Sequence, residues 1–170
     1  MNIDELKSVE KNAISDLAKH LSESDVSFLV KMLVEKDDIL RYNAFLLLQA
    51  HSKETSLVYN HWNELVDKLK SDNSYQRSIG AMLLSENVKW DSECKLSESI
   101  DTYLDCCADQ KFITARQSIQ GITKILNATQ AYDKKIEQRL ANLPLGKYKE
   151  NQQKILAKDI AQALNVLDKH

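Results

Sequence analysis

The sequence predicts an all-α protein, and three observations carry that prediction. Glycine and proline are scarce, with three and one in 170 residues, and the tight turns of β-sheets depend on them. Good helix formers dominate the composition, chiefly Leu, Lys, Ala, Glu and Gln. Apolar residues also recur at helical spacing in segment after segment. The length suits one domain, so we expect residues 1–170 to form a single one.

In chain order, these apolar stripes predict about nine helices of roughly 12 to 20 residues with short connections. Ser22 and Asp25 are spaced as in a capping box, which starts the second helix. Pro144 and Gly146 must interrupt any helix near the end, which leaves residues 147–170 as an expected C-terminal capping helix. The stripes run over Leu6–Leu21, Val26–Val34, Ala44–Leu48, Val58–Leu69, Ile79–Leu83, Leu96–Cys107, Ala115–Leu126, Tyr132–Leu143 and Leu156–Leu167.

Part of the chain repeats. The segment "RYNAFLLL" from Arg41 matches "RSIGAMLL" from Arg77: each has a small residue three positions on and leucines six and seven positions on. Arg116 begins a weaker third copy. The offsets between the arginines, 36 and 39 residues, are about the length of one helix pair. We therefore expect helix pairs that repeat along the chain.

Each of these arginines follows an acid in the preceding turn, and this pattern resembles the HEAT repeats over residues 25–127. The resemblance implies an α-α superhelix of about four stacked antiparallel helix pairs, with irregular helices at each end. It also implies which acid and arginine share a repeat, namely Asp37 with Arg41, Asp72 with Arg77 and Asp109 with Arg116.

The arginines Arg41, Arg77 and Arg116 have two interpretations. Their stems can lie along apolar surface while their heads pair with turn carboxylates or helix-end carbonyls, which is the interpretation we favour. Alternatively, they line the concave face and bind a partner's acids or phosphates. Trp90, just before a turn, is the best candidate for an exposed aromatic contact, although core packing is the commoner fate of a tryptophan.

Charge is the one distinctive global feature. The net charge of −2 argues against a general polyanion binder, so we expect no nucleic acid partner. Residues 91–109 hold six acids against Lys95, whereas residues 133–170 are mildly basic. Ordinary solvated helix faces explain this pattern, but the acidic face could also attract a basic protein or the basic end of a second copy.

No sequence motif indicates chemistry. Glycine-rich phosphate loops and G-x-S-x-G motifs are missing, and Cys94, Cys106 and Cys107 lack zinc spacing. Cys107 lies on an apolar stripe, which predicts a buried thiol. The four histidines are scattered, and we expect Trp62 in the core with His61 as its exposed or half-exposed neighbour. The sequence thus predicts no catalytic residue, no cofactor and no metal ligand.

These features favour a non-enzymatic scaffold that binds another protein through its concave surface. The alternative, implied by the resemblance, is a DNA-binding protein related to the HEAT-like glycosylases that act on alkylated bases. No apolar run is long enough to span a bilayer, and the first residues carry no signal region, so we expect a cytoplasmic protein with no membrane partner.

Overall fold

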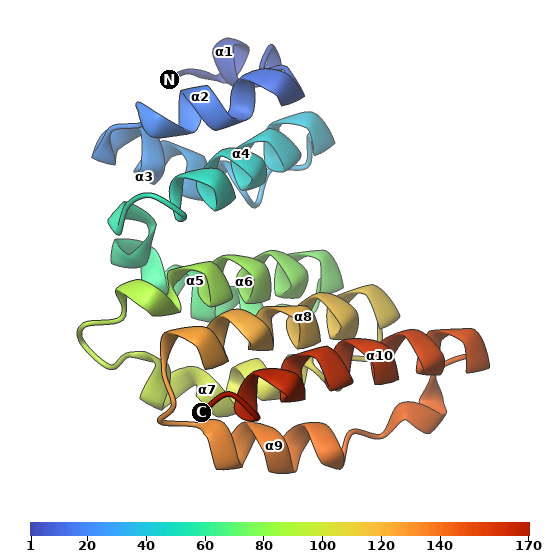
Figure 1. The fold of residues 1–170 in the computed structure, drawn as a ribbon. Coiled ribbons are helices and arrows are strands. Elements are labelled where there is room, and N and C mark those ends of the chain that lie inside the picture. The colour runs from blue at the N-terminus through green and yellow to red at the C-terminus, as the bar shows by residue number, and fades with distance from the viewer. The chain divides into compact units, whose positions relative to one another are not determined.

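The protein is built from helices alone. The computed structural model describes all 170 residues as ten α-helices and four short 3-10 helices, with no strand (Figure 1). The prediction of an all-α fold is confirmed. The chain forms two compact units, Met1–Glu64 and Leu65–His170, and the expected single domain stays a prediction. No helix combines the length and the apolar character needed to cross a bilayer.

The first unit is organised around helix α4 (Asp38–His51), which packs against α1 (Ile3–Lys7), α2 (Ile14–Lys19) and α3 (Glu23–Met32). The 3-10 helix η1 (Lys11–Ala13) precedes α2, and η2 (Leu57–His61) leads into α5 (Trp62–Leu69). The predicted capping box is confirmed at the start of α3: Asp25 N–H donates to Ser22 Oγ, and Ser22 N–H donates to the Asp25 carboxylate. The side chains buried at the centre of this unit include Leu29, Leu33, Ala44, Leu47 and Leu48.

The N-terminal stripe Leu6–Leu21 was expected to be one helix, and this expectation is wrong. The chain leaves the helix after Lys7 and resumes regular α-helix only at Ile14. The break shifts the helical register, so Ile14 and Ala18 face the core while Leu17 is 38% exposed. Breaks of this kind explain why the structure has ten helices of 5 to 18 residues rather than about nine longer ones.

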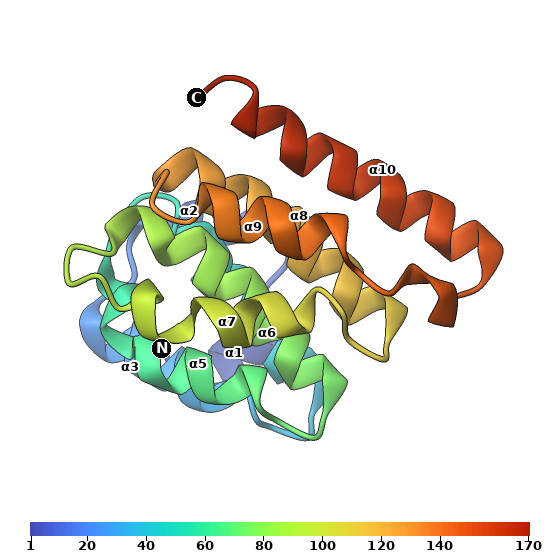
Figure 2. The same ribbon diagram turned by 90° about the horizontal axis from the view of Figure 1, so that it is seen from below.

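The second unit is built around three long helices. Helices α6 (Ser74–Asn87), α8 (Phe112–Ala128) and α10 (Glu150–Leu167) run side by side, with α8 in contact with both neighbours (Figures 1 and 2). Helix α7 (Leu96–Cys106) packs on α6 and α8, and α9 (Asp133–Ala141) contacts α10. The 3-10 helices η3 (Val88–Trp90) and η4 (Leu145–Lys147) lie in the connections.

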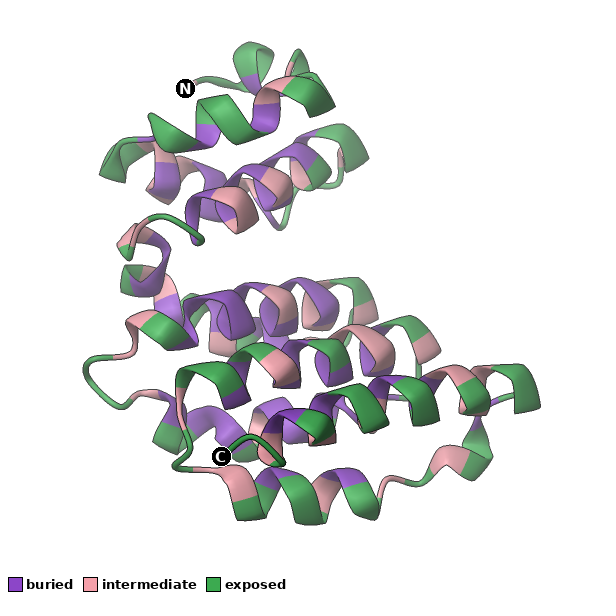
Figure 3. Ribbon diagram, in the orientation of Figure 1, coloured by how far each residue is buried: buried purple, intermediate pink, exposed green.

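Two glycines allow the closest approaches inside this unit. A Cβ on Gly121 would lie 2.1 Å from Tyr103 Oη and 2.8 Å from Ser85 Oγ, so α8 can meet α7 and α6 only without a side chain there. A Cβ on Gly80 would lie 2.9 Å from the Leu65 carbonyl oxygen. Figure 3 shows the resulting buried stripes on α6 and α8, in contrast to the largely exposed outer turns of α9 and α10.

The C-terminal helix folds back onto the same chain. The "NLPLGK" segment interrupts the helix as predicted, since α9 ends at Ala141 and α10 begins at Glu150. The Tyr148 hydroxyl then donates to the Asp109 carbonyl, and Leu156, Ala163 and Val166 are buried along α10. Helix α10 therefore covers α8 within this unit.

Candidate functional site

Arg77 connects the first turn of α6 to the turn that precedes α8. Its Nε and Nη2 donate to the two carboxylate oxygens of Asp109 at 2.6 and 2.9 Å, while Nη1 donates to the carbonyls of Ser71 at 2.7 Å and Asp72 at 3.0 Å. The Asp109 side chain is only 6% exposed. Burial tends to raise the pKa of Asp109, but the hydrogen bonds from Arg77 and from the Lys111 N–H outweigh it and hold the pKa below its usual value.

Arg116 makes the equivalent contact one step along the chain. Its Nε donates to Asp159 Oδ2 on α10 at 2.9 Å, and the Asp159 side chain is 6% exposed. Gln120 donates to the same oxygen at 3.4 Å. In the first unit, Arg41 forms its ion pair with Asp38 and donates to the Glu35 carbonyl at 2.8 Å.

The guanidinium groups do not pair with the acids that the resemblance assigns to the same repeats. The Asp37 carboxylate caps α4 and pairs with Lys7 at 2.9 Å. Asp109 pairs with Arg77 rather than with Arg116. In both contacts the arginine pairs with an acid that lies later in the chain, since Arg116 pairs with Asp159. Each guanidinium group has a carboxylate of its own, so its positive charge is compensated within the chain.

The acidic face of α7 is also largely engaged. Asp101 accepts from Lys135 Nζ at 2.8 Å, and Asp105 pairs with Arg139, so two acids of α7 contact two bases of α9. Asp91 accepts from the backbone N–H groups of Lys95 and Leu96, both at 2.8 Å. The acidic segment and the basic segment noticed in the sequence thus meet inside one molecule.

The aromatic and thiol residues take mainly structural positions. Trp90 is half-buried at the end of η3, with Lys89 Nζ 5.0 Å from its ring centre. Its role as a partner contact stays a prediction. Trp62 is 2% exposed with His61 half-buried beside it, as predicted. Cys107 is buried as predicted, and Cys106 is buried too, with its thiol pKa raised by burial to about 12.

Two histidines link segments of the first unit. His51 is buried and lies 2.6 Å from the Ala18 carbonyl through Nδ1 and 2.8 Å from Thr55 Oγ1 through Nε2. Because a carbonyl only accepts, Nδ1 carries the proton and donates. His61 Nε2 lies 3.3 Å from Ser27 Oγ, and Nδ1 lies 3.0 Å from Glu64 Oε1.

The order Ser27–His61–Glu64 is that of a serine hydrolase triad, yet its setting differs in two ways. The acid of a triad is buried and fixes the imidazole, whereas the Glu64 side chain is 55% exposed. Ser27 also lies inside helix α3 (Glu23–Met32), where backbone N–H groups bond to helical carbonyls and offer no oxyanion hole. We therefore interpret this contact as a link between α3 and η2.

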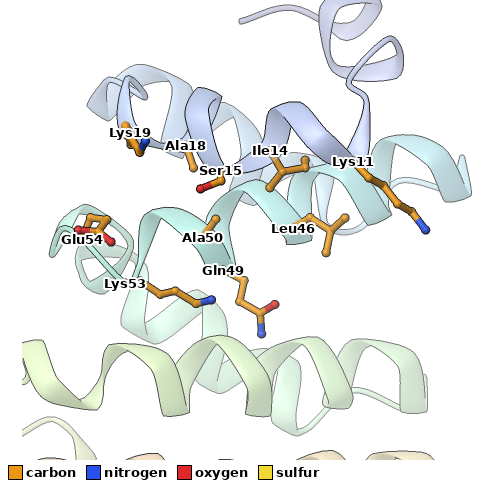
Figure 4. Close-up of a pocket in the computed structure, with 10 residues that line it drawn as sticks. All are labelled: Lys11, Ile14, Ser15, Ala18, Lys19, Leu46, Gln49, Ala50, Lys53 and Glu54. Atoms are coloured by element: carbon orange, nitrogen blue, oxygen red, sulfur yellow. The ribbon is translucent and has the colours of Figure 1, made fainter.

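A hollow of about 320 Å³ lies between α2 and α4 of the first unit (Figure 4). Ile14 and Ala18 of α2 face Leu46 and Ala50 of α4 across it. Ser15 and Gln49 add uncharged polar groups to its lining. Lys11, Lys19, Lys53 and Glu54 complete the rim.

The charges around this hollow do not form a compact anion site. Figure 4 shows the ammonium groups of Lys11, Lys19 and Lys53 at separate points of the rim rather than converging on one point. Lys11 Nζ lies 5.7 Å from the ring centre of Tyr42. The hollow leaves no clear signal in the sequence, since surface lysines at these spacings resemble those of any solvated helix face.

No known family model matches the chain, and no curated protein matches it either. No group of three or more His, Cys, Asp or Glu side chains lies close enough together to hold a metal ion. The features that the structure does show are ion pairs between neighbouring helices, such as Arg77 with Asp109 and Arg116 with Asp159.

Proposed function

We propose that the protein is a non-enzymatic helical-repeat scaffold of the HEAT type, which binds another protein through its concave surface. The second helix of each repeat, namely α6, α8 and α10, forms that surface. One observation carries this proposal. In the second unit an arginine near the start of a second helix pairs with an acid of the following pair, as Arg77 does with Asp109 and Arg116 with Asp159. Such nearest-neighbour linkage is how stacked repeats hold together while one surface stays open for binding.

The contact between first helices supports the same proposal. Asp101 and Asp105 on α7 each pair with a base 34 residues further along the sequence, on α9. The equal offsets mean that α7 and α9 run parallel and in register, as the corresponding helices of two neighbouring repeats do. Fold class alone does not identify a partner, so the proposal claims only that the partner is a protein.

DNA binding, as in the alkylated-base glycosylases, is the weaker candidate. It would need Arg41, Arg77 and Arg116 to face phosphates, but these side chains pair with Asp38, Asp109 and Asp159. Phosphate affinity comes from uncompensated cationic side chains that displace counterions. The ion pairs therefore favour the scaffold over the nucleic-acid binder.

The test is affinity capture by the full chain from a native lysate, with and without nuclease treatment. We expect a defined protein to co-purify in both samples, and we expect sedimentation of the purified chain to show whether that protein is a second copy. Loss of all captured material on nuclease treatment would reverse the order of the two candidates. A chain that captures no protein at all would contradict the scaffold proposal.

A further inference from the structure

A second hollow lies where the first turns of α6 and α8 meet, next to Gln152 in the first turn of α10. Its volume is about 450 Å³. Tyr75 of α6 and Ile113 of α8 line it and remain 39% and 56% exposed, with the half-buried Phe112 beside them. A single exposed apolar side chain is common on a protein surface, but here three large apolar side chains line one hollow.

The walls of this hollow are held in place by hydrogen bonds beneath it. Ser78 Oγ donates to Thr114 Oγ1 at 2.9 Å, and Thr114 Oγ1 donates to the Ser74 carbonyl at 3.1 Å. The ring of Phe112 packs edge-on against Tyr148, with 6.4 Å between ring centres. The surface is therefore already formed before any partner arrives, which lowers the entropy cost of binding.

The only charged side chain that lines the hollow is a lysine. Lys111 is exposed and forms no ion pair. Asp109, two residues earlier in the chain, already accepts two bonds from Arg77 and one from the Lys111 N–H. Lys147 donates to the carbonyl of Ala108, three residues before Lys111, which adds a second ammonium group to this edge of the unit. Among the acids nearby, Asp72 in the turn before α6 is exposed.

We propose that this hollow, lined by Tyr75, Phe112, Ile113 and Lys111, binds an acidic peptide segment of a partner protein that inserts one apolar side chain. The inference rests on the proposed scaffold function and names the surface and the class of partner. The apolar floor receives the inserted side chain, while Lys111 attracts the carboxylates that flank it. The volume suits one or two side chains rather than a whole helix face.

A displayed library of random peptides, selected on the full chain, tests this directly. We expect the enriched peptides to carry an aliphatic or aromatic residue within a few positions of Asp or Glu. A peptide chosen from them is then titrated by fluorescence anisotropy. Ile113→Ser and Lys111→Glu should each weaken it by at least about tenfold, since each removes one half of the contact.

Two matched variants serve as controls. Val34→Ser removes an apolar side chain that is 65% exposed in the first unit, and Lys134→Glu reverses an exposed charge on α9. Both should leave the peptide affinity within about twofold of the original, a difference of only about 0.4 kcal/mol. Because Ile113 and Lys111 are exposed, all four variants should keep the thermal midpoint of the original chain, and this is checked first.

Several results would overturn the inference. Enriched peptides without acids, equal losses in test and control variants, or no enrichment would each do so. Lys111-dependent binding of a dT oligonucleotide would reassign the surface to nucleic acid, and self-association abolished by Ile113→Ser would reassign it to a second copy. If lysate capture finds a protein whose binding ignores Ile113→Ser and Lys111→Glu, the scaffold proposal stands and this surface is wrong.

Discussion

Asp109 receives two hydrogen bonds from Arg77, 32 residues earlier, and a third from the backbone N–H of Lys111. One nearly buried carboxylate thus fixes the turn before α8 against the start of α6. The contact adds an ion pair to the hydrogen bonds that Thr114 makes with Ser78 and Ser74 between the same two helices, and its loss should destabilise the second unit.

Replacing this carboxylate should therefore be costly. Asp109→Asn leaves the Arg77 guanidinium without its counter-charge in a largely buried setting, and we expect the free energy of unfolding to fall by about 3 kcal/mol. The matched control is Asp38→Asn, whose side chain is 85% exposed where it pairs with Arg41. An exposed pair of this kind contributes about 0–1 kcal/mol. Urea unfolding of both variants measures the loss in the free energy of unfolding. Equal losses in the two variants would contradict a structural role for the Arg77 contact.

The same carboxylate predicts acid sensitivity. The pKa of Asp109 is lowered in the folded protein, so the unfolded chain takes up its proton first as the pH falls. The stability from this group is fully present above the unfolded value of about 3.9 and is lost as the pH falls through the lowered folded value. We expect thermal midpoints to drop below about pH 4, and to drop less steeply in Asp109→Asn. Parallel slopes for the two proteins would show that other carboxylates control acid unfolding.

The close packing around Gly121 gives a prediction that reverses helix propensity. Alanine in a helix interior normally stabilises by about 1 kcal/mol relative to glycine. At Gly121 the added Cβ would lie 2.1 Å from Tyr103 Oη, so we expect Gly121→Ala to destabilise by about 1–3 kcal/mol. Gly146→Ala is the control, because nothing lies within 4 Å of its Cβ, and its stability should be nearly unchanged.

A second substitution identifies the cause of that loss. Tyr103→Phe removes the hydroxyl that would meet the new methyl group, although it also removes the hydrogen bond to the Ser118 carbonyl. In the Gly121→Ala background, Tyr103→Phe should therefore cost less than it does alone, and a double-mutant cycle measures the difference. Simple additivity of the two changes would refute the clash.

The helices themselves could be predicted from the sequence because their apolar spacing is strong and local. The stripe Leu96–Cys107 lies along α7, and its apolar residues form the buried side of that helix. The predicted break at Pro144 and Gly146 falls between α9 and α10. The N-terminal stripe misled, because Leu6 and Leu17 fit one helical period while the chain breaks between them. Periodicity does not reveal a break that keeps apolar residues at compatible positions.

The partners of charged residues could not be predicted, since they depend on which helix lies next to which. Asp109 precedes Arg116 in sequence, yet pairs with Arg77, because stacking brings one turn against the previous second helix. The exposed hollow at Ile113 left a signal that was overlooked. Ile39 and Tyr75 stand two residues before Arg41 and Arg77, and Ile113 stands three before Arg116, in the first turn of each helix.

The Ser27–His61–Glu64 contact offers a direct test of whether the protein is a serine hydrolase. Because Glu64 is exposed and the helical backbone at Ser27 offers no oxyanion hole, we expect no reaction with a fluorophosphonate probe, read by mass spectrometry. Chymotrypsin in the same reaction is the positive control. Labelling of Ser27 that disappears in His61→Gln but persists in Ser24→Ala would show an active serine and contradict the non-enzymatic proposal.

Removal of residues 147–170 should expose one side of α8. The deletion takes away Tyr148, whose hydroxyl holds the Asp109 carbonyl, and Asp159, the partner of Arg116, together with the buried Leu156. Each large apolar side chain contributes about 1.5–3 kcal/mol by its burial, so we expect the thermal midpoint to fall by more than about 10 °C. Lys154→Ala, on the exposed side of α10, should leave the midpoint unchanged. An unaltered midpoint after the deletion would mean that α10 does not cap the second unit, because α8 would then be stable without it.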